Sequence, residues 1–377
     1  MVTQNVSAAD ADSLLGSGWI MGIGSDNCLM AWGKPKKAKQ PLRDRLQFYI
    51  PDFYLENKMP WVTFEKTAFV NKSQLIDFLE PLAKQYRLSL TFSEPKFEDF
   101  TNHFEQIKNK ITSGEIEKAV PVVFATTICT MTKAMRAHSL VSVLKSTGSK
   151  VTPYAYFQPT EGIMGATPEI LFSYDSGSGT LETMALAGTR ESVKNKTHPL
   201  TDDEKEMLEH QIVVKGLREK LYGLGELNES KTYVCDLGVL CHLKTDIVLE
   251  TKAKNNEFST EAINKVTGPS DFFIKISEIL HPTAALGVYP LHKDWKILKS
   301  FDGVMSRGRF GAPFGFLNPE GNSKAVVAIR NIQWNEDLIS IGTGCGLVKN
   351  SVLDSEWKEL NLKRSSVFKL LNIEYSK

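Results

Sequence analysis

The chain has 377 residues, of which 42% are hydrophobic and 24% charged, so it can bury a large core in one domain or two. Its 45 basic and 44 acidic side chains leave a formal charge of +1, which argues against nucleic-acid binding. No apolar run approaches the roughly 18 residues of a membrane span, and the N-terminus lacks the features of a signal peptide. The five cysteines form no CxxC pair. We therefore expect a soluble, cytoplasmic protein with reduced thiols.

The first part of the chain is expected to consist of short strands joined by turns. Two apolar runs flank Ser25-Asp26-Asn27, which predicts a β-hairpin. The strands expected here lie at 19–24, 28–32, 47–50 and 61–64. The pattern changes near residue 95, so we interpret 1–96 as a β-rich N-terminal part and 97–377 as the core of the same layered domain.

Beyond this point apolar strands alternate with helical patterns. Helices are expected at 100–111, 203–222, 258–266 and 354–371. Strands are expected at 117–124, 153–157, 183–190 and 325–330, and another is expected to start at Pro168-Glu169. The mixture predicts an α+β layered domain.

The helix predicted at 203–222 begins with an acid-rich turn. Glu206 and Glu209 are three residues apart and therefore neighbour each other on one face. By itself this pattern is more typical of a solvated turn that complements the helix dipole. A second helix, at 354–371, carries Glu356 and Glu359 at the same spacing. Two such helices can enclose a hard divalent cation, because Mg²⁺ typically takes one or two protein carboxylates together with substrate oxygens.

A glycine-rich segment precedes the second acidic helix. Gly342 to Val348 includes three glycines, which can present backbone N–H groups to an anion or form a tight strand exit. Lys363 follows Glu359 by four residues and lies on the same helix face.

Four other residues are candidates on local grounds. Lys118 lies in an apolar strand and is either a surface residue or a base whose pKa is lowered by burial. Glu169 enters an apolar strand, where desolvation would raise its pKa and suit a general acid, although an edge charge is as plausible. Arg330 ends a strand and suits bidentate carboxylate binding. His281 precedes a proline, and a lone histidine is more often structural.

Taken together these segments resemble the chorismate-utilising enzymes: isochorismate, salicylate, anthranilate and aminodeoxychorismate synthases. The resemblance covers roughly residues 97–372 and is carried by motifs in matching order. They are GATPEILF (165–172), MALAGTR (184–190), KEMLEH (205–210), LHPTAALG (280–287), GTGCGLV (342–348) and EWKELNLK (356–363). The resemblance implies a large sandwich of two antiparallel sheets with helices outside and chorismate as the small-molecule substrate, in a monomer or homodimer.

The resemblance also implies roles for individual residues. Glu209 and Glu359 resemble the two Mg²⁺ ligands, with Glu206 and Glu356 as nearby partners. The residues that resemble substrate-binding positions are Gly188, Thr189, His281, Ala285, Phe310, Arg330, Gly344, Cys345, Gly346 and Lys363. Glu169 is similar to the acid that protonates the departing C4 hydroxyl.

Two positions indicate which nucleophile is used. Members of the family that form a covalent amine carry a lysine where this chain has Ala187, and ammonia users carry glutamine where it has Lys118. The resemblance therefore implies that Lys118 activates water. Salicylate synthases tend to carry Thr and Tyr where this chain has Ala285 and Phe310.

We accordingly expect an Mg²⁺-dependent isochorismate synthase that serves menaquinone or siderophore synthesis. Salicylate synthase and the anthranilate synthase large subunit are the alternatives within the family. A weakly active chorismate-binding protein is the alternative outside enzymes, although such a protein needs no acid–base pair.

Overall fold

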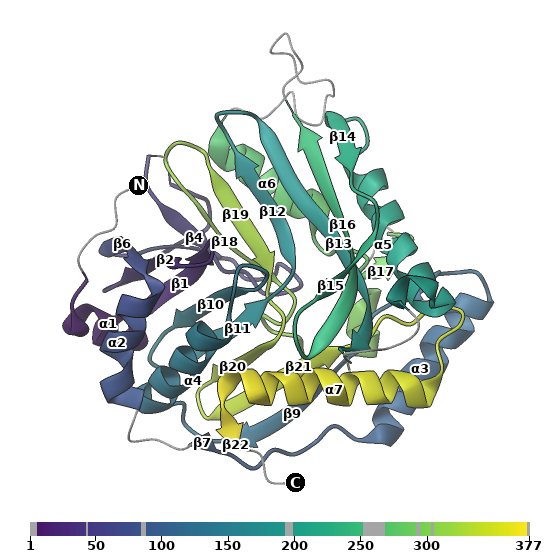
Figure 1. Ribbon diagram of the computed structural model, residues 1–377, viewed down its shortest axis with the longest axis horizontal. Coiled ribbons are helices and arrows are strands. Elements are labelled where there is room, and N and C mark those ends of the chain that lie inside the picture. Colours follow the sequence, from purple (N-terminus) through teal and green to yellow (C-terminus); the bar gives the residue numbers. More distant parts are fainter. Residues whose placement is uncertain are drawn as a thin grey trace.

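Two large antiparallel sheets face each other with helices packed on their outer sides (Figure 1). The computed structural model describes residues 6–42, 44–83, 88–192, 199–251, 268–291, 295–302 and 305–374. One sheet has eight strands in the order β6-β2-β1-β10-β11-β20-β21-β9. The other has ten, in the order β14-β16-β13-β12-β19-β18-β4-β5-β3, with β15 paired to β16. The predicted α+β sandwich is confirmed.

The bounds of the elements are as follows. The helices are α1 (Ala8–Gly16), α2 (Lys72–Ala83), α3 (Phe97–Thr112), α4 (Lys133–Ser146), α5 (Glu204–Leu221), α6 (Pro269–Leu280) and α7 (Leu353–Leu371), with 3-10 turns at Leu200–Asp202 and Trp295–Phe301. The eight-stranded sheet contains β1 (Gly18–Ile23), β2 (Asn27–Trp32), β6 (Lys66–Asn71), β9 (Val122–Ile128), β10 (Thr152–Phe157), β11 (Glu161–Thr167), β20 (Asn331–Asn335) and β21 (Leu338–Gly344). The ten-stranded sheet contains β3 (Lys36–Ala38), β4 (Gln47–Tyr49), β5 (Trp61–Thr63), β12 (Ile170–Asp175), β13 (Thr180–Glu191), β14 (Glu226–Glu229), β15 (Tyr233–Asp236), β16 (Leu240–Glu250), β18 (Pro313–Leu317) and β19 (Ser323–Val327). Two short pairs join β8 (Lys118–Ala119) to β17 (Val288–Tyr289) and β7 (Leu88–Ser89) to β22 (Ile373–Glu374).

Aromatic side chains join the two sheets at one end of the sandwich. Trp19 of β1 packs against Phe48 of β4 and Phe314 of β18, with ring centroids 4.3 and 5.4 Å apart. All three rings are buried. Large aromatic rings remove much apolar surface from water and favour such offset or tilted contacts. This cluster therefore holds the sheets together where the strands of the N-terminal part enter both of them.

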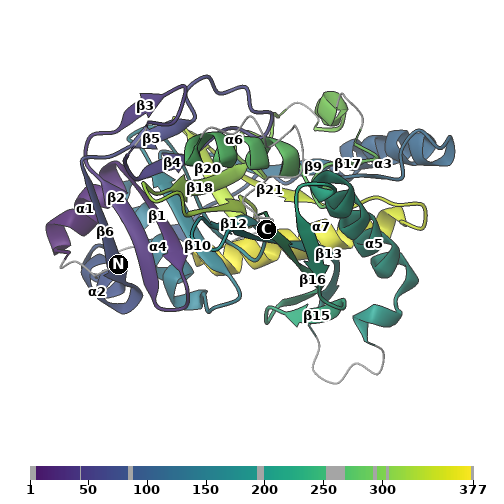
Figure 2. The same cartoon turned by 90° about the horizontal axis from the view of Figure 1, so that it is seen from above.

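At the other end the helices come close to the open edges of the sheets. Helix α5 lies beside β13 and β16, and α7 runs beneath β21 (Figures 1 and 2). Helix α7 buries Leu360, Val367, Phe368 and Leu371, which recur at helical spacing, and it ends at Asn372 in the left-handed conformation. None of the described helices is long and apolar enough to cross a membrane.

The chain crosses between the sheets at two places that matter for the site. One crossing joins β11 to β12 and contains Glu169; the other joins β19 to β20 and contains Arg330. Arg330 has a φ of 56°, which non-glycine residues rarely adopt unless the surrounding structure enforces it. Its carbonyl accepts a hydrogen bond from the N–H of Ala166 at 3.2 Å, so the second crossing is anchored beside the first.

Several sequence-based expectations differ from the structure. The hairpin of β1 and β2 is confirmed, but the expectation of strands alone in the first part is wrong, since α1 and α2 lie there. The strand expected at 117–124 is divided into β8 and β9 around Pro121, which has no N–H to donate to a ladder. The helix expected at 258–266 lies outside the described residues.

Candidate active site

A cluster of four carboxylates forms where the first turns of α5 and α7 meet. Its members are Glu206 and Glu209 of α5 and Glu356 and Glu359 of α7. The ammonium group of Lys205 lies among them. Its Nζ is 3.1 Å from Glu206 Oε1, 3.2 Å from Glu209 Oε2, 3.1 Å from Glu356 Oε1 and 4.0 Å from Glu359 Oε2. The structure thus brings together the acidic residues that the sequence placed on two helices.

Burial and mutual repulsion act on the protons of this cluster. Burial, and then the charge of Glu209, raise the pKa of Glu206 to about 7. Burial also raises the pKa of Glu356 to about 7 against the attraction of Lys205. Glu209 is likewise buried, but Lys205 and Lys118 hold its pKa near 2. The pKa of Lys205 is raised, because the attraction of the carboxylates outweighs its burial.

The donor set suits a hard divalent cation. Carboxylate oxygens are the ligands that Mg²⁺ prefers. Glu356 Oε2 is buried and has no hydrogen-bond partner among the described residues. Within the same ranges, no three His, Cys, Asp or Glu side chains are arranged to hold a metal ion. In this structure the middle of the cluster is instead filled by the Lys205 ammonium.

Lys118 lies against the carboxylate cluster and is completely buried. Its Nζ donates to the carbonyl of Ala284 at 2.7 Å and is 3.2 Å from Glu209 Oε1. Residue 118 belongs to β8, which pairs with β17 and so holds the side chain on the short two-stranded sheet. Burial lowers the pKa of Lys118, an effect that the charge of Glu209 opposes.

Glu169 is also buried, at the crossing between β11 and β12. Its Oε1 accepts a 3.5 Å hydrogen bond from Thr283 Oγ1. The backbone is fixed by Val327, whose N–H donates to the Glu169 carbonyl at 3.0 Å. Burial raises the pKa of Glu169 to about 7, and the charge of Lys118 is the largest opposing effect. This carboxyl is therefore able to hold a proton near neutral pH.

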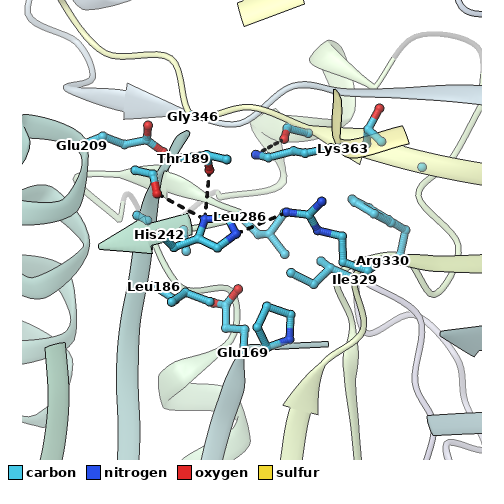
Figure 3. A pocket seen from close by; sticks show the side chains of 18 residues that line it. Glu169, Leu186, Thr189, Glu209, His242, Leu286, Ile329, Arg330, Gly346 and Lys363 are labelled. Carbon is cyan, nitrogen blue, oxygen red and sulfur yellow. Dashed lines mark hydrogen bonds between the residues drawn. The ribbon is translucent and has the colours of Figure 1, made fainter. Parts of the chain in front are cut away.

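A cavity of about 60 Å³ is lined by residues of the carboxylate cluster and by Glu169 (Figure 3). Glu169, Glu209, Arg330 and Lys363 all line it. Lys363 Nζ is 2.6 Å from Glu359 Oε1 and donates to the carbonyl of Gly344 at 2.9 Å. Burial lowers the pKa of Arg330 to about 10, so the guanidinium stays charged at neutral pH. The cavity thus offers two cations and a protonatable carboxyl to a ligand.

His242 of β16 lines the cavity, and its segment, 240–243, is compatible by sequence with either the core or a site. Its Nδ1 is 3.1 Å from Thr189 Oγ1 and 3.2 Å from the carbonyl of Gly188, and its Nε2 is 3.5 Å from Arg330 Nη2 (Figure 3). Burial and then the charges of Arg330 and Lys363 lower its pKa to about 3, which keeps the ring neutral. Only the pairing of β16 with β13 brings His242 opposite Thr189.

The model of the family described as "Chorismate binding enzyme" matches residues 63–372. The chain belongs to this family. Its members among curated proteins include relatives with two different activities. Isochorismate synthase MenF of Bacillus subtilis is 29% identical over 231 residues, which cover 59% of this chain and 45% of that protein. Anthranilate synthase component 1 of Acinetobacter calcoaceticus is 25% identical over 342 residues, which cover 82% of this chain and 63% of that protein.

The solved structure of MenF, the menaquinone-specific isochorismate synthase of Escherichia coli, has the same fold as this chorismate-binding enzyme. The two superpose with a TM-score of 0.72 at 16% identity, over 98% of this chain and 92% of the other. The chain spans about half the length of the curated isochorismate synthases that it matches, or slightly less.

The structure places most of the expected substrate-binding residues of this chorismate-binding enzyme around the cavity. Those that line it are Gly188, Thr189, Ala285, Phe310, Arg330, Gly344, Gly346 and Lys363. Cys345 is buried and is absent from the lining. His281 also lies elsewhere: its Nε2 is 2.7 Å from the carbonyl of Phe53, and its ring packs edge-on against Phe53 and Trp295.

A second cavity, of about 400 Å³, adjoins the first. The two share Pro168, His242 and Arg330 in their linings. The outer cavity is bounded by the end of α4, the turn between β15 and β16, and the last turns of α7. The Arg330 and His242 side chains therefore lie between the two spaces.

Proposed function

We propose that this protein is an isochorismate synthase that adds water to C2 of chorismate while the hydroxyl at C4 leaves. The observation that carries the proposal is a pair of buried groups at this site. Glu169 lines the cavity and has a raised pKa, and Lys118 lies 3.2 Å from the lining residue Glu209 and has a lowered pKa. The lowered pKa of the amine favours its neutral, basic form, and the raised pKa of the carboxyl favours its protonated, acidic form, as an acid–base pair requires. The presence of both favours an enzyme over a binding protein.

Glu169 supplies the proton for the leaving group in this reaction. A carboxyl with a pKa of about 7 is largely protonated at slightly acid pH and gives up its proton readily. It protonates the C4 oxygen, so that water rather than hydroxide departs. Thr283 and the fixed backbone at residue 169 hold the carboxyl in place, and the effect of burial on its pKa exceeds that of the Lys118 charge.

Lys118 supplies the base. In its neutral form, which burial favours, the amine takes a proton from water as the oxygen bonds to C2. As the new bond to C2 forms, the two conjugated ring double bonds shift and the C4–O bond breaks. Water provides the atoms gained at C2 and water leaves from C4, so the reaction is an isomerisation. One proton passes to Lys118 and one leaves Glu169, and exchange with solvent restores both.

The charged groups of the cavity fit a substrate with two carboxylates. Arg330 donates to Ser366 Oγ at 3.0 Å and has no carboxylate in hydrogen-bond contact among the described residues. A buried guanidinium of this kind binds a carboxylate through paired hydrogen bonds. The carboxylate cluster would hold Mg²⁺ through Glu209 and Glu359, with Glu206 and Glu356 beside them. Bound Mg²⁺ would supply positive charge that holds the carboxylate on the ring.

Two lining residues favour isochorismate over salicylate as the product. Phe310 and Ala285 both line the cavity and carry no hydroxyl. Salicylate-forming relatives are expected to have Tyr and Thr at these positions. Pyruvate elimination therefore lacks the polar groups that the resemblance associates with it.

The experiment that tests the proposal is a product analysis. The purified protein is incubated with chorismate and Mg²⁺, with and without a chelator, and the products are separated by chromatography. We expect isochorismate in equilibrium with chorismate, and none with the chelator. Salicylate with pyruvate would replace the proposal by salicylate synthase. Anthranilate formed only when ammonium is present would refute the role of Lys118 as a base for water.

Two variants test the acid–base assignment in the same assay. Lys118→Met and Glu169→Gln preserve the length of each side chain but remove proton transfer, and each is expected to lower kcat by about 10²- to 10⁴-fold. Glu182→Gln, at an exposed position on β13, is the control and should retain full activity. Turnover near the wild-type rate in either buried variant would contradict the assignment.

A further inference from the structure

Lys205 has a place in the site that neither the acid–base pair nor substrate binding explains. Its ammonium is within 3.2 Å of carboxylate oxygens on both α5 and α7. It is therefore the group that connects the acidic turns of the two helices. The side chain is only 18% exposed, so the charge lies inside the cluster rather than at its rim.

The formal charges of the cluster indicate that the Lys205 ammonium acts as a counterion. When every group is counted in its ionised form, four carboxylates face three ammonium groups, those of Lys205, Lys118 and Lys363. The formal balance is one negative charge. Without Lys205 it would be two negative charges, confined to buried groups that repel one another. Lys205 is thus the internal counterion that allows the two helix ends to stay together when no metal is bound.

A divalent cation cannot bind at this position while the ammonium remains. Mg²⁺ requires oxygens at about 2.0–2.1 Å, whereas Lys205 Nζ lies 3.2 Å from Glu209 Oε2 and 4.0 Å from Glu359 Oε2, on the two residues proposed as ligands. Two cations at one centre would also repel each other strongly in a buried site. If a divalent cation replaces the ammonium, the formal balance of the cluster becomes zero. Replacement of the Lys205 ammonium by Mg²⁺ therefore satisfies both the short Mg²⁺–oxygen distances and the charge balance of the cluster.

We propose that Lys205 is a positioning residue that occupies the metal position of the metal-free protein, holds the four glutamates in place, and withdraws when Mg²⁺ binds. This inference rests on the proposed Mg²⁺ site and adds that the affinity of the metal is set by competition with a lysine of the chain itself. The lysine preassembles the ligands and at the same time weakens the binding of the metal.

The test is a direct measurement of Mg²⁺ binding by isothermal titration calorimetry, with thermal unfolding of the metal-free protein as a second readout. Lys205→Met removes the competing charge, so Mg²⁺ should bind at least tenfold more tightly, and the metal-free variant should unfold at a lower temperature. Lys205→Arg retains a cation and should keep both properties close to those of the wild type. Lys215→Met, on an exposed position of the same helix, should change neither.

Withdrawal of the side chain can be measured separately. Acetylation of lysine amines by a water-soluble ester, quantified by mass spectrometry, should be slow at Lys205 without metal and severalfold faster with saturating Mg²⁺, whereas Lys215 should react equally in both states. Equal or weaker Mg²⁺ binding by Lys205→Met, or acetylation of Lys205 that does not respond to Mg²⁺, would overturn the inference.

These outcomes are distinguishable from failure of the proposed function. A wild-type protein that makes isochorismate, together with unchanged Mg²⁺ affinity in Lys205→Met, would refute the role of Lys205 alone. A wild-type protein that makes no isochorismate, together with tighter Mg²⁺ binding in the variant, would support the role of Lys205 and refute the reaction.

Discussion

Replacing Glu169 by glutamine is expected to lower kcat by about 10²- to 10⁴-fold and at the same time to stabilise the protein in mildly alkaline solution. Burial raises the pKa of Glu169 from 4.5 to about 7. Each pKa unit corresponds to about 1.4 kcal/mol. The ionised carboxyl therefore lowers the free energy of unfolding by roughly 3 kcal/mol relative to the protonated one.

The sign of this effect follows from proton binding. Between pH 4.5 and about 7 the folded protein holds the proton of Glu169 while the unfolded chain releases it. Stability from this residue is therefore fully present below pH 4.5 and is lost as the pH rises through about 7. Glutamine does not titrate, so the variant does not lose this stability as the pH rises. The free energy of unfolding of the variant minus that of the wild type should increase by roughly 2–3 kcal/mol between about pH 5 and pH 8.

Urea unfolding followed by tryptophan fluorescence at these two pH values measures the difference. Glu161→Gln is a control with the opposite sign: burial opposes the effect, but Arg309 and Lys37 lower the pKa of Glu161. The stabilising contribution of Glu161 is present above the pKa that it has in the unfolded chain, and it is lost only in acid. That variant should be less stable than the wild type by nearly the same amount at both pH values. A difference for Glu169→Gln that is equal at the two pH values would refute the buried, proton-holding state of this carboxyl.

Three further outcomes are expected. The rate should fall as the pH rises above about 7, because Glu169 must be protonated to act as the acid; a pH–rate profile that is flat through pH 8 would contradict this. Gly346→Ala should lower kcat at least about 10²-fold, since its Cβ would lie 2.0 Å from Glu209 Oε1. The control Gly148→Ala, whose Cβ would have no atom within 4 Å, should leave kcat unchanged. Arg330→Lys should raise KM about 10- to 100-fold, measured by steady-state kinetics, through loss of paired hydrogen bonds.

Much of the sandwich could be predicted from local pattern. The hairpin of β1 and β2 has an alternating sequence around a polar turn, and α5 and α7 have apolar residues at helical spacing. Helices α1 and α2 were missed because their sequences are short and their apolar faces are narrow. Each buries only three side chains, and α2 contains Pro81. Such helices are determined by packing on the sheet more than by their own periodicity.

The candidate site was predictable where residue type and spacing carry the chemistry. Glutamates three residues apart on two helices, and an arginine at the end of a strand, are visible in the sequence. The structure brings the glutamates into one cluster, of which Glu209 lines the cavity together with Arg330. The role of His242 cannot be predicted from its segment alone, because it depends on the pairing of β16 with β13. His242 reaches the cavity through a register shift between Ala187 and Thr189. No local pattern predicts a β-bulge of this kind.

The difference between Lys118 and Lys205 shows most clearly what a sequence cannot supply. Both are lysines that contact Glu209, at 3.2 Å in each case. Lys118 is fully buried on a short sheet and faces few carboxylates, so desolvation dominates and its pKa is lowered. Lys205 lies among four carboxylates contributed by two helices, and its pKa is raised. The same side chain becomes a candidate base in one place and a permanent cation in the other. The number of carboxylates around each ammonium decides between these roles, and that number is fixed only when α5 and α7 pack together.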